Sequence, residues 1–311
     1  MKILLLGTNG QLGRSFIEDG GLATRGELVT ASRDGQRFDG VAIETADLAV
    51  PGSLPALLDR LRPDLIVNAA AYTAVDRAEQ EEALATRVNG KAVGVLGRWA
   101  ATRGALVVHY STDYIFDGAA SAPYPIDAST APLGAYGRSK LAGERALRGS
   151  GAAHFIFRTA WVYAPHGQNF LRTMLRVGAE RDELRVVTDQ VGAPTSTALI
   201  VAGTLAALDA WQAADATQRR ELQGFHHLVA SGHTSWHGFA EAIFAGAMER
   251  GLIARAPQVA AITTADYPTP VKRPAWSVLD NVGFQQRFGY ALPNWQSGLH
   301  DVLDVLAHQR A

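Results

Sequence analysis

Residues 2–13 of the chain read KILLLGTNGQLG, and this stretch decides the fold. Residues 2–6 form a short apolar run, which is typical of a strand buried on both faces of a parallel sheet. Three glycines spaced three apart follow, and we expect a helix at residues 14–19. Such glycines let the chain turn tightly, let its backbone approach a pyrophosphate, and let the helix pack closely on the strand. Directly after a first strand, this pattern predicts a dinucleotide site.

Strand and helix patterns alternate through the first 160 residues. Strands are expected at 27–32, 41–45, 64–71, 105–110 and 154–158, and helices at 54–61, at 75–103 and around residues 136–140. This alternation predicts an α/β fold with a doubly wound parallel sheet of the Rossmann type. We expect a dinucleotide-binding domain at residues 1–160, with residues 184–230 returning to it. A smaller, mixed α/β substrate-binding lobe is expected at residues 161–183 and 231–311, with a soft boundary because the chain crosses between lobes more than once.

The end of the second predicted strand bears on cofactor choice. NAD-preferring sites place an Asp or Glu there, whereas this chain has Ser32 and Arg33, followed by Asp34. An arginine suits a ribose 2′-phosphate, so the sequence favours NADPH, with NADH as a second accepted cofactor. Asp47 has two interpretations that remain open: a contact with the adenine amino group, or a helix cap before Pro51.

A candidate proton donor lies in the segment YGRSK, residues 136–140. On a helix, Tyr136 and Lys140 would emerge on one face, one turn apart. A nearby cation lowers the pKa of a phenol toward neutrality, where a general acid works best. By itself the pattern also fits a surface helix with a solvated face. Hydroxyl side chains, including Thr112, gather after the predicted strand at 105–110, where open α/β sheets bind ligands.

Composition excludes several classes of function. The 311 residues carry a formal net charge of −1, which argues against a nucleic-acid partner or an anionic membrane surface. The chain has no cysteine, which excludes disulfides and thiolate sites and fits a cytoplasmic protein. Neither a signal peptide nor a membrane-spanning segment is expected. The nine histidines show no metal-ligand spacing.

Motif blocks along nearly the whole chain resemble one family, the dTDP-4-dehydrorhamnose reductases of the extended short-chain dehydrogenase/reductase superfamily. The blocks are GTNGQLG at 7–13, VNAAAYTAVDRAE at 67–79, HYSTDYIFDG at 109–118, YGRSKLAGE at 136–144, FRTAWVYA at 157–164, NFLRTML at 169–175, DQVGAPT at 189–195, HLVASG at 227–232 and YPTPVKRP at 267–274.

The resemblance implies a set of site residues. The catalytic residues would be Thr112, Tyr136 and Lys140, with Lys140 lowering the pKa of Tyr136 and binding the nicotinamide ribose. The cofactor-binding residues would be Gly7, Gly10, Gln11, Leu12, Gly13, Ser32, Arg33, Asp47, Leu48, Ala71, Tyr72, Thr73, Tyr136 and Lys140. The substrate residues would be Thr112, Asp113, Trp161 and Asn169. Lys272 and Arg273 are further candidates, for the substrate diphosphate, because a guanidinium suits phosphate, and an ordinary surface pair is the open alternative.

The resemblance also implies a reaction. NADPH would reduce the C4 ketone of dTDP-4-dehydro-β-L-rhamnose to give dTDP-β-L-rhamnose, the last step of dTDP-L-rhamnose biosynthesis. The alternatives are another nucleotide-sugar 4-ketoreductase, an epimerase of the same superfamily, and a non-catalytic cofactor-binding regulatory subunit. The last is disfavoured because the catalytic residues are all present.

One feature departs from the family pattern. Some members form a magnesium-linked dimer through carboxylates, but Ala198 and Val305 stand where acidic ligands would be expected. A hard cation needs several oxygen ligands, so we predict no metal site. Whether the chain forms a homodimer stays open.

Overall fold

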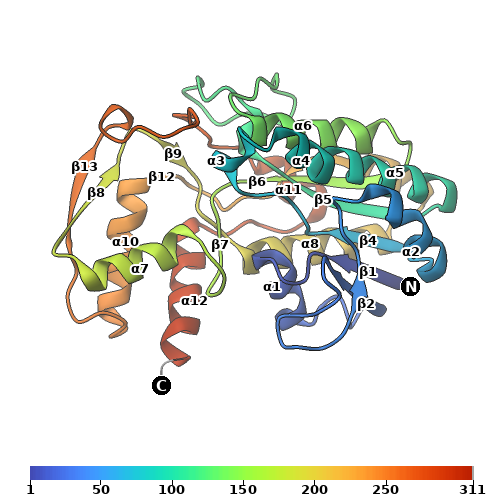
Figure 1. Cartoon of the computed structure of the whole chain (residues 1–311), viewed down its shortest axis with the longest axis horizontal. Helices are drawn as coiled ribbons and strands as arrows, with labels where there is room; N and C mark the ends of the chain where they lie inside the picture. Colours follow the sequence, from blue (N-terminus) through green and yellow to red (C-terminus); the bar gives the residue numbers. More distant parts are fainter. Residues whose placement is uncertain (310–311) are drawn as a thin grey trace.

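Seven parallel strands form the central sheet of the chain, a computed structural model of which describes residues 1–309 (Figure 1). Their order is β11-β6-β5-β4-β1-β2-β3. The order reverses between β1 and β4, and ligands of open α/β sheets bind at such a switch point. The strands are β1 (Lys2–Leu6), β2 (Glu27–Ser32), β3 (Glu44–Thr45), β4 (Leu65–Asn68), β5 (Leu106–Thr112), β6 (Ala153–Thr159) and β11 (Gly224–His227).

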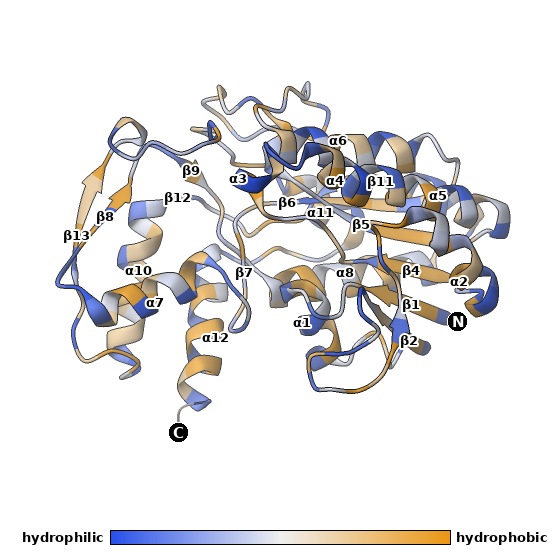
Figure 2. Cartoon of the chain, in the orientation of Figure 1, coloured by the Kyte–Doolittle hydropathy of each residue, from blue (hydrophilic) through white to orange (hydrophobic). Residues whose placement is uncertain are grey.

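Helices cover both faces of this sheet, because its strands are apolar on both sides (Figure 2). In β1, Ile3 and Leu5 pack toward α1, α8 and α11, whereas Leu4 and Leu6 pack toward α2, α5 and α6. The helical segments around the sheet are α1 (Gln11–Asp19), η1 (Pro51–Ser53), α2 (Leu54–Leu61), α3 (Val75–Ala78), α4 (Glu82–Thr86), η2 (Arg87–Lys91), α5 (Ala92–Arg103), η3 (Asp113–Ile115), α6 (Ala135–Arg148), α8 (Thr197–Ala213), α9 (Ala216–Leu222) and α11 (Val282–Phe288).

A smaller half of the molecule lies beyond the carboxyl ends of the strands (Figure 1). Its strands form three two-stranded pairs, β7 with β10, β9 with β12 and β8 with β13. The elements are β7 (Val162–Tyr163), α7 (Phe170–Glu180), β8 (Glu183–Val187), β9 (Val191–Gly192), β10 (Thr195–Ser196), β12 (Thr234–Ser235), α10 (Trp236–Glu249), β13 (Gln258–Ile262), η4 (Thr264–Asp266) and α12 (Trp295–His308).

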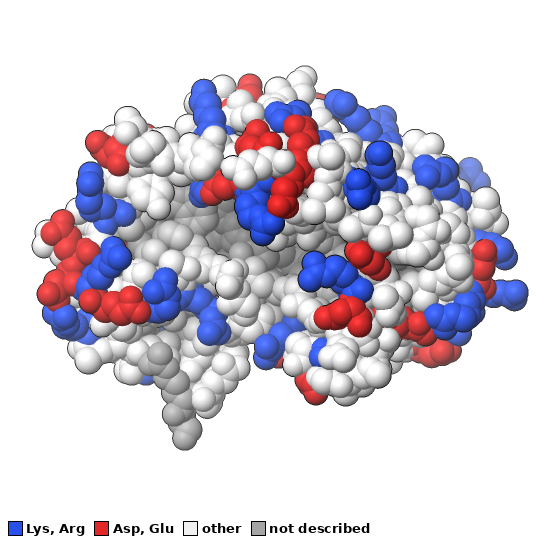
Figure 3. Space-filling view, in the orientation of Figure 1, with Lys and Arg blue, Asp and Glu red and all other residues white. Residues whose placement is uncertain are grey.

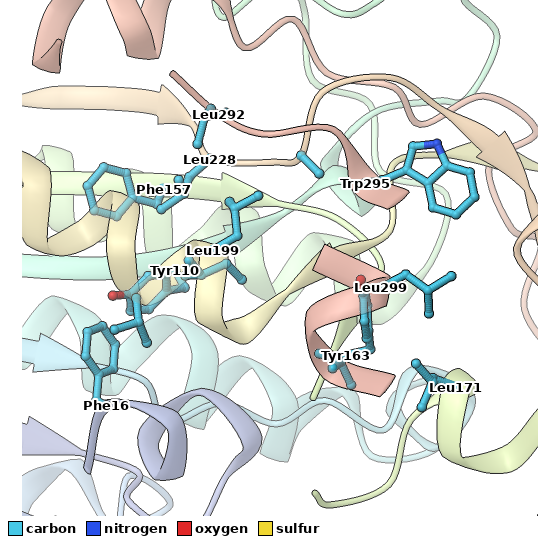
Figure 4. Close-up of a cluster of buried hydrophobic side chains, with 14 of the residues drawn as sticks. Phe16, Tyr110, Phe157, Tyr163, Leu171, Leu199, Leu228, Leu292, Trp295 and Leu299 are labelled. Atoms are coloured by element: carbon cyan, nitrogen blue, oxygen red, sulfur yellow. The ribbon is translucent and has the colours of Figure 1, made fainter. Parts of the chain in front are cut away.

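One apolar core runs from the sheet into the smaller half (Figure 4). Phe16 and Phe157 belong to the sheet half, and they lie in the same cluster as Leu171, Trp295 and Leu299 of the smaller half. Burying apolar surface stabilises by about 25 cal/mol per Å², so a shared core holds the two halves together. The relative placement of cofactor and substrate groups therefore depends on this common packing.

The strand pattern at 27–32 and the helix pattern at 54–61 are confirmed residue for residue by β2 and α2. Other boundaries were wrong: the helix predicted at 75–103 is divided into α3, α4, η2 and α5, and the strand predicted at 41–45 is reduced to the two residues of β3. Two further differences have a local cause. The first helix begins at Gln11, not at residue 14, because Gly10 already serves as its N-cap. The strand predicted at 64–71 ends at Asn68, whose Oδ1 accepts the Ala70 N–H at 3.2 Å and draws the chain out of the ladder.

The segment 184–230 divides its contacts between the two halves. Strand β11 joins the central sheet beside β6, and α8 packs on α1. Strand β8 instead pairs in parallel with β13, outside the central sheet. The division into domains itself stays a prediction. Among the described helices, none combines the length and the apolar character needed to cross a membrane.

A buried ion pair fastens α6 to the sheet. Arg158 on β6 donates through Nε and Nη2 to both oxygens of Glu144 on α6, at 3.0 and 2.9 Å. The two side chains are only 6% and 2% exposed. Arg158 also donates to the carbonyl of Ile126 at 2.9 Å, which ties the loop before α6 to the same site. Removing one partner would leave the other charge buried without compensation.

We therefore predict that Glu144→Ala lowers the free energy of unfolding by about 3 to 5 kcal/mol, measured by urea denaturation. The matched control is Glu44→Ala, which breaks the more exposed pair between Glu44 and Arg60. That change should cost about 1 kcal/mol or less. Equal losses in the two variants would contradict this account of the buried pair.

Candidate active site

The glycine-rich turn after β1 is built for close backbone approach. Gly7 has a φ of +82°, and a Cβ there would lie 2.6 Å from the Ala70 nitrogen. A Cβ on Gly13 would lie 2.1 Å from the Gly7 carbonyl oxygen. Gly10 caps α1 without a side-chain hydrogen bond, so the first N–H groups of the helix are open to an anion. These residues fit the pyrophosphate of a dinucleotide.

The end of β2 lies beside this turn. Ser32 is buried and donates to Asp34 at 2.8 Å, whereas Arg33 is exposed. Asp47 accepts the Ala49 N–H at 2.8 Å and so closes a local turn. It is not a helix cap, because Val50 occupies that position before η1. Contacts of Ser32, Arg33, Asp47 and the buried Leu48 with a cofactor stay predictions.

The segment Ala71, Tyr72 and Thr73 is held by Asn89, a residue to which the sequence analysis assigned no role. Asn89 accepts the Tyr72 N–H at 2.8 Å and donates to the Tyr72 carbonyl at 3.0 Å. Its Nδ2 also donates to the Ser139 hydroxyl of α6 at 2.9 Å. Asn89 lies in η2, a π-helical turn, and such turns are frequent at functional sites.

The predicted proton donor lies beside the predicted hydroxyl partner. Thr112 ends β5 and Tyr136 is in the first turn of α6, and the Thr112 side chain lies close enough to Tyr136 to influence the pKa of its phenol. Burial raises the pKa of Tyr136, the charge of Asp113 raises it further, and Thr112 lowers it in part. Tyr136 is therefore a protonated phenol at neutral pH, as a proton donor must be.

Lys140 is buried at the end of β5, 2% exposed. Its Nζ donates to the Tyr110 carbonyl at 2.5 Å and lies 3.4 Å from His109 Nε2. Burial lowers the pKa of Lys140 to about 8. Our expectation that Lys140 lowers the pKa of Tyr136 was wrong, because its ammonium turns inward to the strand. The shift at Tyr136 is caused by burial and by Asp113, Thr112 and Tyr114.

Asp113 is a buried carboxyl group in direct contact with Thr112. The Thr112 hydroxyl donates to Asp113 Oδ1 at 2.9 Å. Ser277, which the sequence analysis missed, donates to the Val191 carbonyl at 3.2 Å and lies close enough to Asp113 to lower the pKa of its carboxyl group in part. Burial raises the pKa of Asp113 to about 6. Its Oδ2 is buried without a partner among the described residues, which suits an acceptor for a hydroxyl of a ligand.

Trp161 has an unusual backbone for its size, with a φ of +47°. Its ring stacks on Trp236, with 3.5 Å between centroids and 2° between planes. A Cβ on Gly192 would lie 2.4 Å from the same ring, so the backbone there also approaches Trp161 closely. Trp236 covers one face of Trp161, so a ligand can meet only the rest of the ring. Backbone strain of this kind concentrates at functional sites.

The last two predicted substrate residues already have partners within the chain. Arg273 Nη2 donates to Asp76 Oδ2 at 3.2 Å, while its Nε is buried without a partner among residues 1–309. Asn169 is engaged by Gln11 and by its own loop. Their contacts with a substrate stay predictions. Figure 3 shows the hollow between the two halves of the molecule, with charged side chains at its rim.

No cluster of three or more His, Asp or Glu side chains in residues 1–309 is arranged to hold a metal ion. The absence of a metal site stays a prediction. The site brings together the hydroxyls of Thr112 and Tyr136, the amine of Lys140 and the carboxyl group of Asp113, all of which can bind or donate protons.

A doubly wound sheet, a glycine-rich turn after its first strand and a Thr–Tyr–Lys set at its carboxyl edge define an extended short-chain dehydrogenase/reductase. Residues 1–308 match the family model described as the RmlD substrate binding domain. The chain belongs to the family of the dTDP-4-dehydrorhamnose reductases, which confirms the resemblance seen in the sequence.

Three relatives illustrate the similarity. A dTDP-4-dehydrorhamnose reductase of Burkholderia thailandensis is 45% identical over 306 residues, covering 95% of this chain and 96% of the relative. A crystal structure of such a reductase from Clostridium acetobutylicum superposes with a TM-score of 0.85 at 33% identity, covering 98% of this chain and 99% of that one. The Bacillus anthracis reductase, solved in complex with NADP, gives a TM-score of 0.82 at 28% identity, covering 98% and 99%.

The titration of Asp113 yields a stability prediction. Its pKa is about 6 in the folded chain and 3.8 without the fold, so the unfolded chain releases this proton first as the pH rises. Between pH 4 and pH 7, the free energy of unfolding of the wild type should fall relative to that of Asp113→Asn, by up to about 3 kcal/mol. Urea denaturation at both pH values measures the difference.

Asp39→Asn is the matched control: Arg37 holds the pKa of the exposed Asp39 at about 2, below its ordinary value of 3.8, so the wild type should change little relative to this variant between pH 4 and pH 7. A difference between wild type and Asp113→Asn that does not change with pH would mean that Asp113 titrates normally in the folded chain.

Proposed function

We propose that the chain reduces the C4 ketone of dTDP-4-dehydro-β-L-rhamnose with NADPH, giving dTDP-β-L-rhamnose. The observation that carries this proposal is the hydroxyl pair of Tyr136 and Thr112 at the sheet's carboxyl edge, in a chain that matches dTDP-4-dehydrorhamnose reductases over nearly its whole length. A protonated phenol beside a second hydroxyl can receive one carbonyl oxygen. This reaction would be the last step of dTDP-L-rhamnose biosynthesis.

The cofactor site of this proposal is the turn after β1. Gly7, Gly10 and Gly13 leave room for a pyrophosphate where any Cβ would clash or crowd, and the N-terminus of α1 faces it. When bound, the nicotinamide supplies the hydride that reduces C4. Arg33 at the end of β2 would meet a ribose 2′-phosphate, which supports NADPH as the preferred cofactor, with NADH as a second one.

The chain's own residues handle the proton. Tyr136 gives its phenolic proton to the ketone oxygen as negative charge develops there. Thr112 lies beside it, and its hydroxyl would exchange its hydrogen bond to Asp113 for one to the same ketone oxygen. Lys140, largely protonated at neutral pH with a pKa of about 8, supplies positive charge at the end of β5 and would bind the nicotinamide ribose. Buried surroundings strengthen each of these electrostatic effects.

The substrate would lie along the hollow between the two halves. Asp113 Oδ2 would accept a sugar hydroxyl, and the Trp161 ring would border the sugar. Arg273 would exchange its contact with Asp76 for the diphosphate, which a guanidinium binds well. We also place the protein in the cytoplasm, which its lack of cysteine fits.

The direct test is to supply purified protein with dTDP-4-dehydrorhamnose and NADPH and to follow the loss of NADPH absorbance. Stoichiometric consumption with formation of dTDP-rhamnose supports the proposal. Purified protein that carries bound NAD and shows no net consumption of NADPH would point instead to an epimerase. Consumption with a different dTDP-4-keto sugar only would point to another 4-ketoreductase.

Tyr136→Phe tests the proton donor. The change keeps the ring but removes the acidic proton, so kcat should fall by about two to four orders of magnitude while NADP+ still binds. Steady-state kinetics and calorimetry measure the two quantities. A near-normal kcat would show that another group protonates the alkoxide.

Arg33→Ala tests the cofactor preference. Wild type should prefer NADPH to NADH, and the variant should show a raised KM for NADPH with little change for NADH, because only NADPH carries the 2′-phosphate. Initial rates with each cofactor provide the comparison. Equal loss with both cofactors would show that Arg33 does not meet that phosphate.

A further inference from the structure

A loop of the smaller half, residues 164–169, is fastened to the helix that begins the cofactor site. His166 Nε2 lies 3.3 Å from the Glu18 carboxylate and 3.3 Å from the Ser15 hydroxyl, both on α1. A Cβ on Gly167 would lie 2.9 Å from Cγ of Gln11, the first residue of α1. Asn169 Nδ2 donates to Gln11 Oε1 at 2.7 Å. The segment thus reaches the first turn of α1.

The hydrogen-bond partners of Asn169 determine the orientation of the Asn169 and Gln11 side-chain amides. Asn169 is the N-cap of α7, and its Oδ1 accepts the Arg172 N–H at 3.0 Å. Its Nδ2 faces the carbonyl oxygens of Ala164 and His166, at 2.9 and 3.2 Å. Carbonyl oxygens only accept, so the atom that faces them must be the amide nitrogen. The Gln11 atom that meets this nitrogen must then be its oxygen.

This orientation leaves the Nε2 group of Gln11 available as a hydrogen-bond donor. With Oε1 held by Asn169, the Nε2 group stays free as a donor, and it makes no hydrogen bond to any residue in the described range 1–309. Gln11 follows Gly10 directly at the start of α1, where backbone N–H groups are open to an anion. A side-chain amide in this place could turn either its NH2 group or its oxygen toward a phosphate. Only the NH2 group would stabilise the bound phosphate, because it donates hydrogen bonds to it.

We propose that Asn169 is a positioning residue that fixes the Gln11 amide with its nitrogen toward the cofactor pyrophosphate. Asn169 belongs to the smaller half, so that half contributes to cofactor binding without touching the cofactor. This inference rests on the proposed dinucleotide site, and it gives Asn169 a role other than the substrate contact predicted from the resemblance.

Asn169→Ser tests the inference. Serine is as good an N-cap as asparagine, so α7 stays capped, but its short side chain cannot reach Gln11. Isothermal titration calorimetry with NADP+ should show affinity reduced about fivefold to tenfold, because a hydrogen bond to a charged group is lost or weakened. Adenosine 2′-monophosphate, which lacks the pyrophosphate, should bind unchanged. The matched control is Asn294→Ser at the N-cap of α12, which should leave both ligands unaffected.

A double variant distinguishes the loss of Gln11 orientation from a general disturbance of the cofactor site by Asn169→Ser. In a Gln11→Met background no amide remains to be oriented, so Asn169→Ser should cause no further loss of NADP+ affinity. As an independent variant, Gln11→Glu keeps an acceptor for Asn169 and replaces the free donor by a carboxylate oxygen. It should weaken NADP+ binding more than Gln11→Met does.

Three results would overturn the proposal: additive losses in the double variant, equal weakening of adenosine 2′-monophosphate, or wild-type affinity in Asn169→Ser. A wild-type chain that binds no NADP+ would overturn the proposed cofactor and this inference together. Wild-type binding with an unaffected Asn169→Ser variant would overturn this inference alone.

Discussion

The close packing of α6 against η3, which follows β5, and against η2 is the constraint on which the site depends. A Cβ on Gly137 would lie 2.2 Å from the Tyr114 carbonyl oxygen, and one on Gly143 would lie 2.1 Å from the Asn89 carbonyl oxygen. The backbones therefore approach too closely to leave room for a side chain at either glycine. These close approaches fix the position of α6 relative to the strands. In that position Tyr136 lies beside Thr112, and the Lys140 side chain points toward the Tyr110 carbonyl.

Burial at this contact determines the protonation of the site. It raises the pKa values of Asp113 and Tyr136 and lowers that of Lys140, because charged forms lose their hydration there. Shifted groups of this kind cluster where an enzyme carries out acid–base chemistry. Glu144 lies on the same face of α6 as Lys140, four residues beyond it, and its pair with Arg158 of β6 anchors the helix. The charge of Glu144 also favours the ammonium form of Lys140.

Local patterns were predictable from the sequence because they depend on neighbours along the chain. The strand 27–32, the helix 54–61 and the glycine turn are of this kind, and the motif blocks identified the family. Contacts between distant residues were not predictable: Asn89 with Tyr72, Ser277 with Asp113, and β8 with β13 leave no periodic signal. The direction of the Lys140 side chain was missed for the same reason. Helical spacing predicts on which face of the helix a side chain lies, but it does not predict which group that side chain contacts.

The central claim is that this packing brings two hydroxyls to one carbonyl oxygen. A crystal structure of the chain with NADP+ and dTDP-rhamnose tests it most directly. The account predicts that the sugar O4 lies within hydrogen-bond distance, about 2.6 to 3.2 Å, of both Tyr136 Oη and Thr112 Oγ1. An O4 atom beyond hydrogen-bond reach of both hydroxyls, with the sugar otherwise well ordered, would contradict it.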